Sequence, residues 1–155
     1  MSAASDQSRQ QELAAIEQRI NELVQQSRIL EAYMNDIMTR QVTLSRLMEE
    51  AHLASNTIQT ITSESDVESL MPIGIGVYVK TLVPPIKKLV INLDAGVAIE
   101  KSREDALNYV ETRIKEYEVA ARQLEAQRQE ITMRINQLQS QINQMVQAAQ
   151  QQQHG

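Results

Sequence analysis

The sequence predicts a mainly α-helical protein with a small β region, in which two long helices pair as an antiparallel coiled-coil hairpin. Two observations predict this fold class. Six of the seven Gly and Pro residues fall between Pro72 and Gly96, so long segments free of helix breakers lie on either side. Both of those segments carry an apolar heptad repeat, and the segment between them changes to a two-residue repeat.

The first helix is predicted over residues 1–62, with residues 1–6 disordered. Ten of its twelve positions spaced alternately by three and four are apolar. These positions are Leu13, Ile16, Ile20, Leu23, Ser27, Leu30, Met34, Ile37, Gln41, Leu44, Met48 and Ala51. A 3.5-residue repeat sustained for this long is typical of a left-handed coiled coil.

The second helix is predicted over residues 102–150, followed by a disordered tail at residues 151–155. Ser102 is its expected N-cap, because Glu104 and Asp105 supply an acidic first turn. Its heptad positions are Leu107, Val110, Ile114, Tyr117, Ala121, Leu124, Arg128, Ile131, Ile135, Leu138, Ile142, Met145 and Ala149. Only Arg128 breaks the repeat. We call the heptad positions of both helices the seam.

The two helices are of similar length, which favours a register with Ala51 level with Leu107. In that register Arg128 faces Leu30 and can reach Glu31 across the seam and Glu125 one turn back. We interpret it as a seam Arg that is paired or extends its charged end to solvent. This register is a hypothesis, because a slip of seven residues preserves the same apolar pattern.

Residues 63–101 are predicted to hold a polar connector and four short strands. Alternating, β-branched segments bounded by Gly and Pro predict these strands at residues 70–73, 77–83, 89–93 and 97–99. A tight turn is expected at Asp94, Ala95 and Gly96. So small a sheet is marginal alone and needs partners.

Composition excludes several classes of function. There is no Cys, so disulfides, Cys-ligated zinc and thiol catalysis are absent, and the formal net charge of -5 argues against nucleic acid as a partner. No run of about 18 apolar residues could span a membrane. The polar N-terminus does not have the apolar core of a secretory signal, so a cytoplasmic location is expected.

No motif predicts catalysis, a cofactor or a metal. The segment Gly74-Ile75-Gly76 begins like a dinucleotide-binding fingerprint, but Val79 replaces the third Gly and a strand follows. A bend or bulge in the sheet is the better interpretation. His52 and His154 lack neighbouring partners for a metal site or a triad. We therefore expect a protein that is not an enzyme.

Residues 135–153 carry no charged side chain, although Ile, Leu, Met and Val recur among Asn, Gln and Ser. Two interpretations remain open. An uncharged surface with flexible Met side chains suits weak, shape-tolerant contact with apolar partners. The same residues could instead be the end of a stable seam followed by a disordered Gln tail.

Two segments closely resemble the alpha family of archaeal prefoldin subunits. They are residues 70–80, Leu-Met-Pro-Ile-Gly-Ile-Gly-Val-Tyr-Val-Lys, and residues 94–102, Asp-Ala-Gly-Val-Ala-Ile-Glu-Lys-Ser. The resemblance implies an ATP-independent chaperone without cofactors. It further implies a hexamer of two alpha and four beta subunits, in which the β-hairpins form an intersubunit β-barrel. The coiled-coil tips would capture unfolded proteins and pass them to a group II chaperonin.

The resemblance also assigns residues to two surfaces. Client binding at the tips is expected at Leu13, Ile16, Ile20, Leu138, Ile142 and Met145. Oligomerisation is expected at Leu70, Ile73, Val77, Val79, Val83, Leu89, Ile91, Leu93, Val97 and Ile99. The alternative is a structural or scaffolding coiled-coil protein that binds one defined partner helix.

Overall fold

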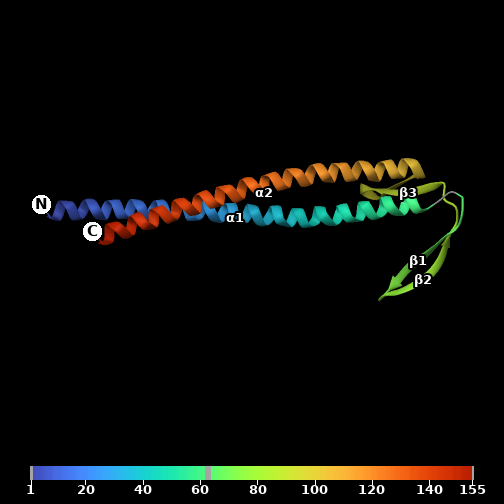
Figure 1. Cartoon of the computed structure of the whole chain (residues 1–155), viewed down its shortest axis with the longest axis horizontal. Coiled ribbons are helices and arrows are strands. Elements are labelled where there is room, and N and C mark those ends of the chain that lie inside the picture. The colour runs from blue at the N-terminus through green and yellow to red at the C-terminus, as the bar shows by residue number, and fades with distance from the viewer. Residues whose placement is uncertain (1, 62–63, 155) are drawn as a thin grey trace. The chain divides into compact units, whose positions relative to one another are not determined.

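A computed structural model describes residues 2–61 and 64–154 (Figure 1). Its elements are helix α1 (Ser2–Thr60), strands β1 (Val67–Gly74), β2 (Val77–Val83) and β3 (Lys88–Leu93), the 3-10 helix η1 (Asp94–Gly96), strand β4 (Val97–Ser102) and helix α2 (Arg103–His154). They divide into a helical unit, Met1–Val42 with Ala121–Gly155, and a mixed unit, Thr43–Ala120. The predicted mainly helical fold with two β-hairpins is confirmed.

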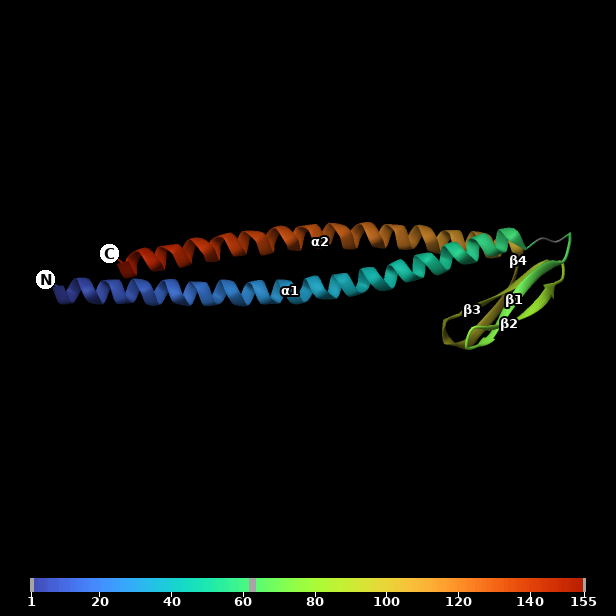
Figure 2. The ribbon, with the colours of Figure 1, turned by 60° about the horizontal axis from the view of Figure 1, so that its bottom comes forward.

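The seam holds the helical unit together. There the α1 and α2 segments lie side by side in both views (Figures 1 and 2), and they run antiparallel. Leu23 is only 1% exposed and Ile37 is also buried. Every predicted seam position of either helix is buried or half-buried except Arg128, so the heptad prediction is confirmed.

The predicted register, in contrast, was wrong by about one heptad. The Gln41 amide donates to Glu125 at 3.0 Å, and the Gln152 amide donates to Glu12 at 3.1 Å. In these pairs, each α1 residue lies opposite an α2 residue that is nearer the C-terminus of α2 than predicted. The heptad pattern could not reveal the difference, because it repeats after seven residues.

Arg128 pairs with Glu125, which the sequence places within its reach, but it does not face Leu30. Its Nη1 lies 4.0 Å from Glu125 Oε2, and both side chains are about half exposed. Leu30, its expected neighbour, lies instead beside Leu138 and Arg134. The guanidinium of Arg128 thus remains in solvent, as expected for a charged group on an apolar seam.

The mixed unit contains two antiparallel hairpins, β1–β2 and β3–β4, which form separate two-stranded sheets. All four predicted strands are present, and β1 and β4 are longer than predicted. The pairing of β1 with β2 shifts between Pro72 and Gly74, which confirms the expected irregularity at this point. Within the described residues these two sheets form no barrel, so a barrel requires assembly with other subunits.

Side chains and backbone groups join the base of α2 to the end of α1. Ser102 Oγ accepts a hydrogen bond from the Asp105 backbone N–H at 3.1 Å, which confirms the predicted N-cap. Arg103 donates from Nε to the Ile58 carbonyl at 3.0 Å and from Nη2 to the Gln59 carbonyl at 2.9 Å. Because the last carbonyls of a helix lack partners within it, Arg103 stabilises the C-terminus of α1.

Helix α2 extends beyond its predicted end at residue 150, whereas α1 lies within its predicted range of residues 1–62. Helix α1 begins at Ser2 and α2 continues to His154, so residues 2–6 and 151–154 are helical where the sequence predicts disorder. Ala, Ser and Gln dominate these ends, and no Gly or Pro stops the helix before residue 155. The predicted helix end at residue 62 and the connector start at residue 63 lie outside the described residues.

The substitution Arg103→Ala should lower the free energy of unfolding by about 1–2 kcal/mol, because two charge-assisted hydrogen bonds are lost. Urea unfolding followed by circular dichroism at fixed protein concentration measures this change. Arg40→Ala is the matched control, since it removes only an exposed ion pair with Asp36 and should cost less than about 0.5 kcal/mol. Equal effects of both variants would contradict the assigned role of Arg103.

Candidate functional site

The six residues expected at the tips all lie in the helical unit, on the seam. Leu13, Ile16 and Ile20 of α1 and Leu138, Ile142 and Met145 of α2 are each half-buried. A pair of helices cannot enclose its seam on all sides, so these side chains pack against the other helix and still present apolar atoms to solvent. The structure thus places the six residues on one seam, partly accessible.

Amide side chains of α2 make polar contacts at this end of the helices, where α1 carries an ion pair of 3.1 Å between Arg19 and Glu22. Gln152 Nε2 donates to the Glu12 carboxylate at 3.1 Å. Gln152 Oε1 is buried without a hydrogen-bond partner, the one such side-chain atom among the described residues. The Gln139 amide donates to Asn143 at 3.3 Å on the same helix. The uncharged, amide-rich side chains of α2 cost less to desolvate than charged ones, so the α2 side of this end suits apolar contact.

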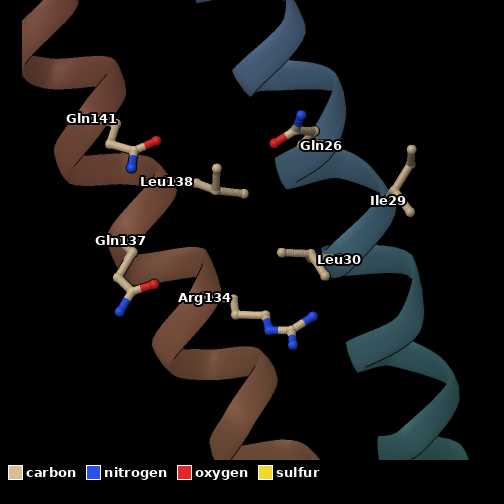
Figure 3. A pocket seen from close by; sticks show the side chains of 7 residues that line it. All are labelled: Gln26, Ile29, Leu30, Arg134, Gln137, Leu138 and Gln141. Carbon is tan, nitrogen blue, oxygen red and sulfur yellow. The ribbon is translucent and has the colours of Figure 1, made fainter.

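A shallow groove of about 320 Å³ follows the seam in the helical unit (Figure 3). Leu30 and Leu138 point toward one another across it. Gln26, Gln137, Gln141 and Arg134 complete its sides together with Ile29, which is 56% exposed. Of these residues, the sequence had indicated only Leu138 as a binding residue. Ile29 was missed because it lies beside the heptad pattern and carries no periodic signal of its own.

The β1–β2 hairpin exposes an apolar face. Alternation and cross-strand pairing place Val67, Ser69 and Met71 on the same face as Val83, Thr81 and Val79, their partners on β2. Val77 continues this face toward the turn. Met71, Val77 and Val79 are exposed, whereas the residues near the base of the hairpin are half-buried. We call these seven residues the apolar face.

The opposite face of this hairpin is mixed. Leu70, Tyr78 and Leu82 are exposed there, beside an ion pair of 3.9 Å between Lys80 and Glu68. Of the expected oligomerisation residues, Val77, Val79 and Val83 therefore lie on the apolar face, and Leu70 lies on the mixed face. Ile73 is exposed at the irregular pairing next to the turn.

The β3–β4 hairpin is arranged differently, because one of its faces is turned toward α2. Leu89, Ile91 and Leu93 alternate as half-buried residues along β3, and Ile99 pairs with Ile91 on that face. Val97, next to the turn, remains exposed. The chain itself thus partly covers four of the five oligomerisation residues expected on this hairpin.

Tyr109 of α2 contacts the inner face of the β3–β4 hairpin. Lys101, on the inner side of β4, places its Nζ 6.0 Å from the Tyr109 ring centre, and the Arg113 guanidinium lies 5.4 Å from the same centre. Arg113 Nη2 donates to the Tyr109 hydroxyl at 3.3 Å. This hydrogen bond to Tyr109 is the largest of the causes that raise the pKa of Arg113 above its ordinary value. The Arg103 backbone N–H also donates to the Lys87 carbonyl at 3.3 Å.

Within residues 2–61 and 64–154, no group of three or more His, Cys, Asp or Glu side chains could hold a metal ion. In the same part of the chain, no helix is long and apolar enough to cross a membrane.

Comparison with known proteins agrees with this arrangement. The sequence model of the prefoldin subunit family matches residues 30–152. The chain is 37% identical to prefoldin subunit alpha of Nitrosopumilus maritimus over 135 residues, which cover 87% of this chain and 93% of the relative. It is 29% identical to prefoldin subunit alpha of Methanoculleus marisnigri, over 84% of this chain and 87% of the relative.

A solved structure shares the fold. It is the cryo-EM structure of filamentous PFD from Methanocaldococcus jannaschii, with a TM-score of 0.62 and 22% sequence identity, covering 78% of this chain and 98% of that one. Coiled-coil helices joined by two hairpins, one of which exposes an apolar face, are typical of a subunit of an assembly. The chain belongs to the prefoldin subunit family, a family of molecular chaperones, and its relatives are archaeal alpha subunits.

The two hairpins should respond differently when a carboxylate replaces one of their apolar side chains. Val79→Asp changes an exposed residue, so we expect loss of assembly with less than about 0.5 kcal/mol change in the stability of the chain. Ile91→Asp puts a carboxylate at a half-buried position of the inner face, so it should also destabilise the chain by about 2 kcal/mol or more. Native mass spectrometry with a partner subunit and urea unfolding of the chain alone measure the two effects.

Val90→Asp is the matched control, because Val90 is exposed on the other face of β3. It should leave the stability of the chain unchanged. Full assembly of the Val79→Asp variant, or equal stability of the Ile91→Asp and Val90→Asp variants, would refute the assigned orientation of the hairpins.

Proposed function

We propose that this chain is a chaperone subunit that captures unfolded proteins at the ends of its coiled coil, without ATP, and passes them to a group II chaperonin. In this proposal it works in the cytoplasm, within a hexamer of two alpha and four beta-type subunits. It has no catalytic activity and needs no cofactor or metal.

One observation carries the assignment of the client surface. The last part of α2, residues 135–153, has no charged side chain and presents half-buried Leu138, Ile142 and Met145. An unfolded protein exposes apolar side chains of many shapes, and Met and Leu adapt to them with little specificity. The groove beside Leu30 and Leu138 adds apolar surface of the same kind.

Contact at one end of one chain is weak, and assembly would compensate for this. Several coiled coils on one platform can hold the same client, so the combined affinity exceeds that of each contact. Each contact can still dissociate separately. Transfer to a chaperonin can therefore proceed by competition, and nucleotide hydrolysis is unnecessary.

Aggregation assays with unrelated denatured proteins test this proposal. We expect the assembled protein to suppress their aggregation, and removal of residues 1–20 and 135–155 to reduce suppression at least about fivefold while the oligomer survives. Val42→Ser is a control in the same unit, since Val42 is highly exposed but lies outside both tip segments, and it should retain full suppression.

The outcomes separate the proposal from its alternative. A scaffolding coiled coil would bind one folded partner helix and would not protect unrelated proteins. Undiminished suppression after truncation, with the oligomer intact in native mass spectrometry, would show that clients bind elsewhere.

A further inference from the structure

Three glutamines line the groove beside Leu30 and Leu138, and their amides are available to a ligand. Gln26 belongs to α1, and Gln137 and Gln141 belong to α2 (Figure 3). All three are exposed. Within residues 2–61 and 64–154, their amides make no hydrogen bond to another protein group, whereas several other glutamine amides of the helices do. Each amide offers an acceptor oxygen and a donor nitrogen.

The spacing of two of these amides matches an extended peptide. Gln137 and Gln141 lie one turn apart on the α2 side of the groove. Four residues of an α-helix rise about 6 Å, and two residues of an extended chain rise about 6.6 Å. A peptide that runs along α2 in an extended conformation would therefore place the backbone N–H and C=O groups of every second residue opposite these two amides. A helical peptide offers no such groups, because its backbone is hydrogen-bonded within the helix.

The floor of the groove is apolar. Leu30 and Leu138 point toward one another across it, and the exposed Ile29 lies at its α1 side (Figure 3). Its volume of about 320 Å³ is enough for one large aliphatic side chain. The groove thus combines a place for a single apolar side chain with amides on both sides that can bind the adjoining backbone.

The charges around the groove suit an uncharged occupant. Among the described residues that line it, only Arg134 is charged, and its Nη2 lies 2.8 Å from Glu130 Oε1 on the same helix. This ion pair leaves no net charge beside the groove. Beyond Arg134, the rest of α2 up to residue 153 has no charged side chain. The groove also shares Leu138 with the client surface proposed above, so the two surfaces are continuous.

We propose that this groove binds an extended, uncharged segment of an unfolded polypeptide, with one apolar side chain between Leu30 and Leu138 and the adjoining backbone hydrogen-bonded to Gln137 and Gln141. This inference rests on the proposed function and deepens it, because it assigns recognition of the client backbone to amide side chains. A folded protein pairs nearly all of its buried backbone groups internally. Amides that bind the backbone therefore distinguish an unfolded chain from a folded one, whatever its sequence.

Two synthetic peptides with blocked ends test the role of the backbone. One is an uncharged peptide rich in Ser and Thr with a single central Leu. The other is identical but carries N-methyl groups on the residues before and after the Leu, which removes their N–H donors. Fluorescence anisotropy measures the binding of each peptide to the assembled protein. We expect N-methylation to weaken binding at least about fivefold, because two hydrogen bonds are lost.

The variant that carries both Gln137→Ala and Gln141→Ala should bind the two peptides equally. Its matched control carries Gln123→Ala and Gln127→Ala, because these glutamines are also exposed and four residues apart on α2 but do not line the groove. The control should distinguish the peptides as the unchanged protein does. Ala favours the helix at least as well as Gln, so neither variant loses helical structure.

Three outcomes would overturn the proposal. They are equal binding or no binding of the two peptides by the unchanged protein, continued discrimination in the variant of Gln137 and Gln141, and tighter binding of the same peptide when it is stapled into a helix. The last result would assign the groove to a folded partner helix. The aggregation assay of the proposed function is judged separately, because this variant keeps the apolar residues at the ends of both helices.

Discussion

The structure depends on packing along a seam between only two helices. Apolar residues spaced alternately by three and four keep facing the other helix, and the Gly and Pro residues are kept out of α1 and α2. Two helices cannot enclose what they share, so most seam residues are half-buried and few are buried as fully as Leu23. The interaction that holds the helices together therefore also leaves partly accessible apolar side chains, which is the property that capture of unfolded proteins requires.

The mixed unit also has too few layers to cover all of its apolar residues, and here those residues lie on strands. A two-stranded sheet is marginal alone, and the two hairpins find support in different ways. The β3–β4 hairpin rests one face near α2, where Tyr109 contacts Lys101 and Arg113. The apolar face of β1–β2 receives cover only near its base, so its outer part requires another subunit. Assembly thus follows from what the single chain leaves exposed.

Much of this could be predicted from periodicity. Heptads, alternating strands and the Ser102 cap are local patterns, and each is present in the structure. The register was not predictable in this way, because a heptad slip changes no apolar contact type. The hydrogen bonds of Arg103 and the orientation of Ile91 depend on which elements meet in space. The residues next to them in the sequence do not encode this. Ile75 was recognised only as part of a bend, since its exposure and φ follow from the folded turn.

Hydrogen–deuterium exchange on the assembled complex, with and without an unfolded client, tests the central claim most directly. That claim is that the ends of the coiled coil bind clients while the hairpins hold the assembly. The account predicts slower exchange in peptides from residues 1–20 and 135–154 when the client is present, and unchanged exchange in β1 to β4. Slower exchange confined to the hairpins, with no change at the ends of α1 and α2, would contradict it.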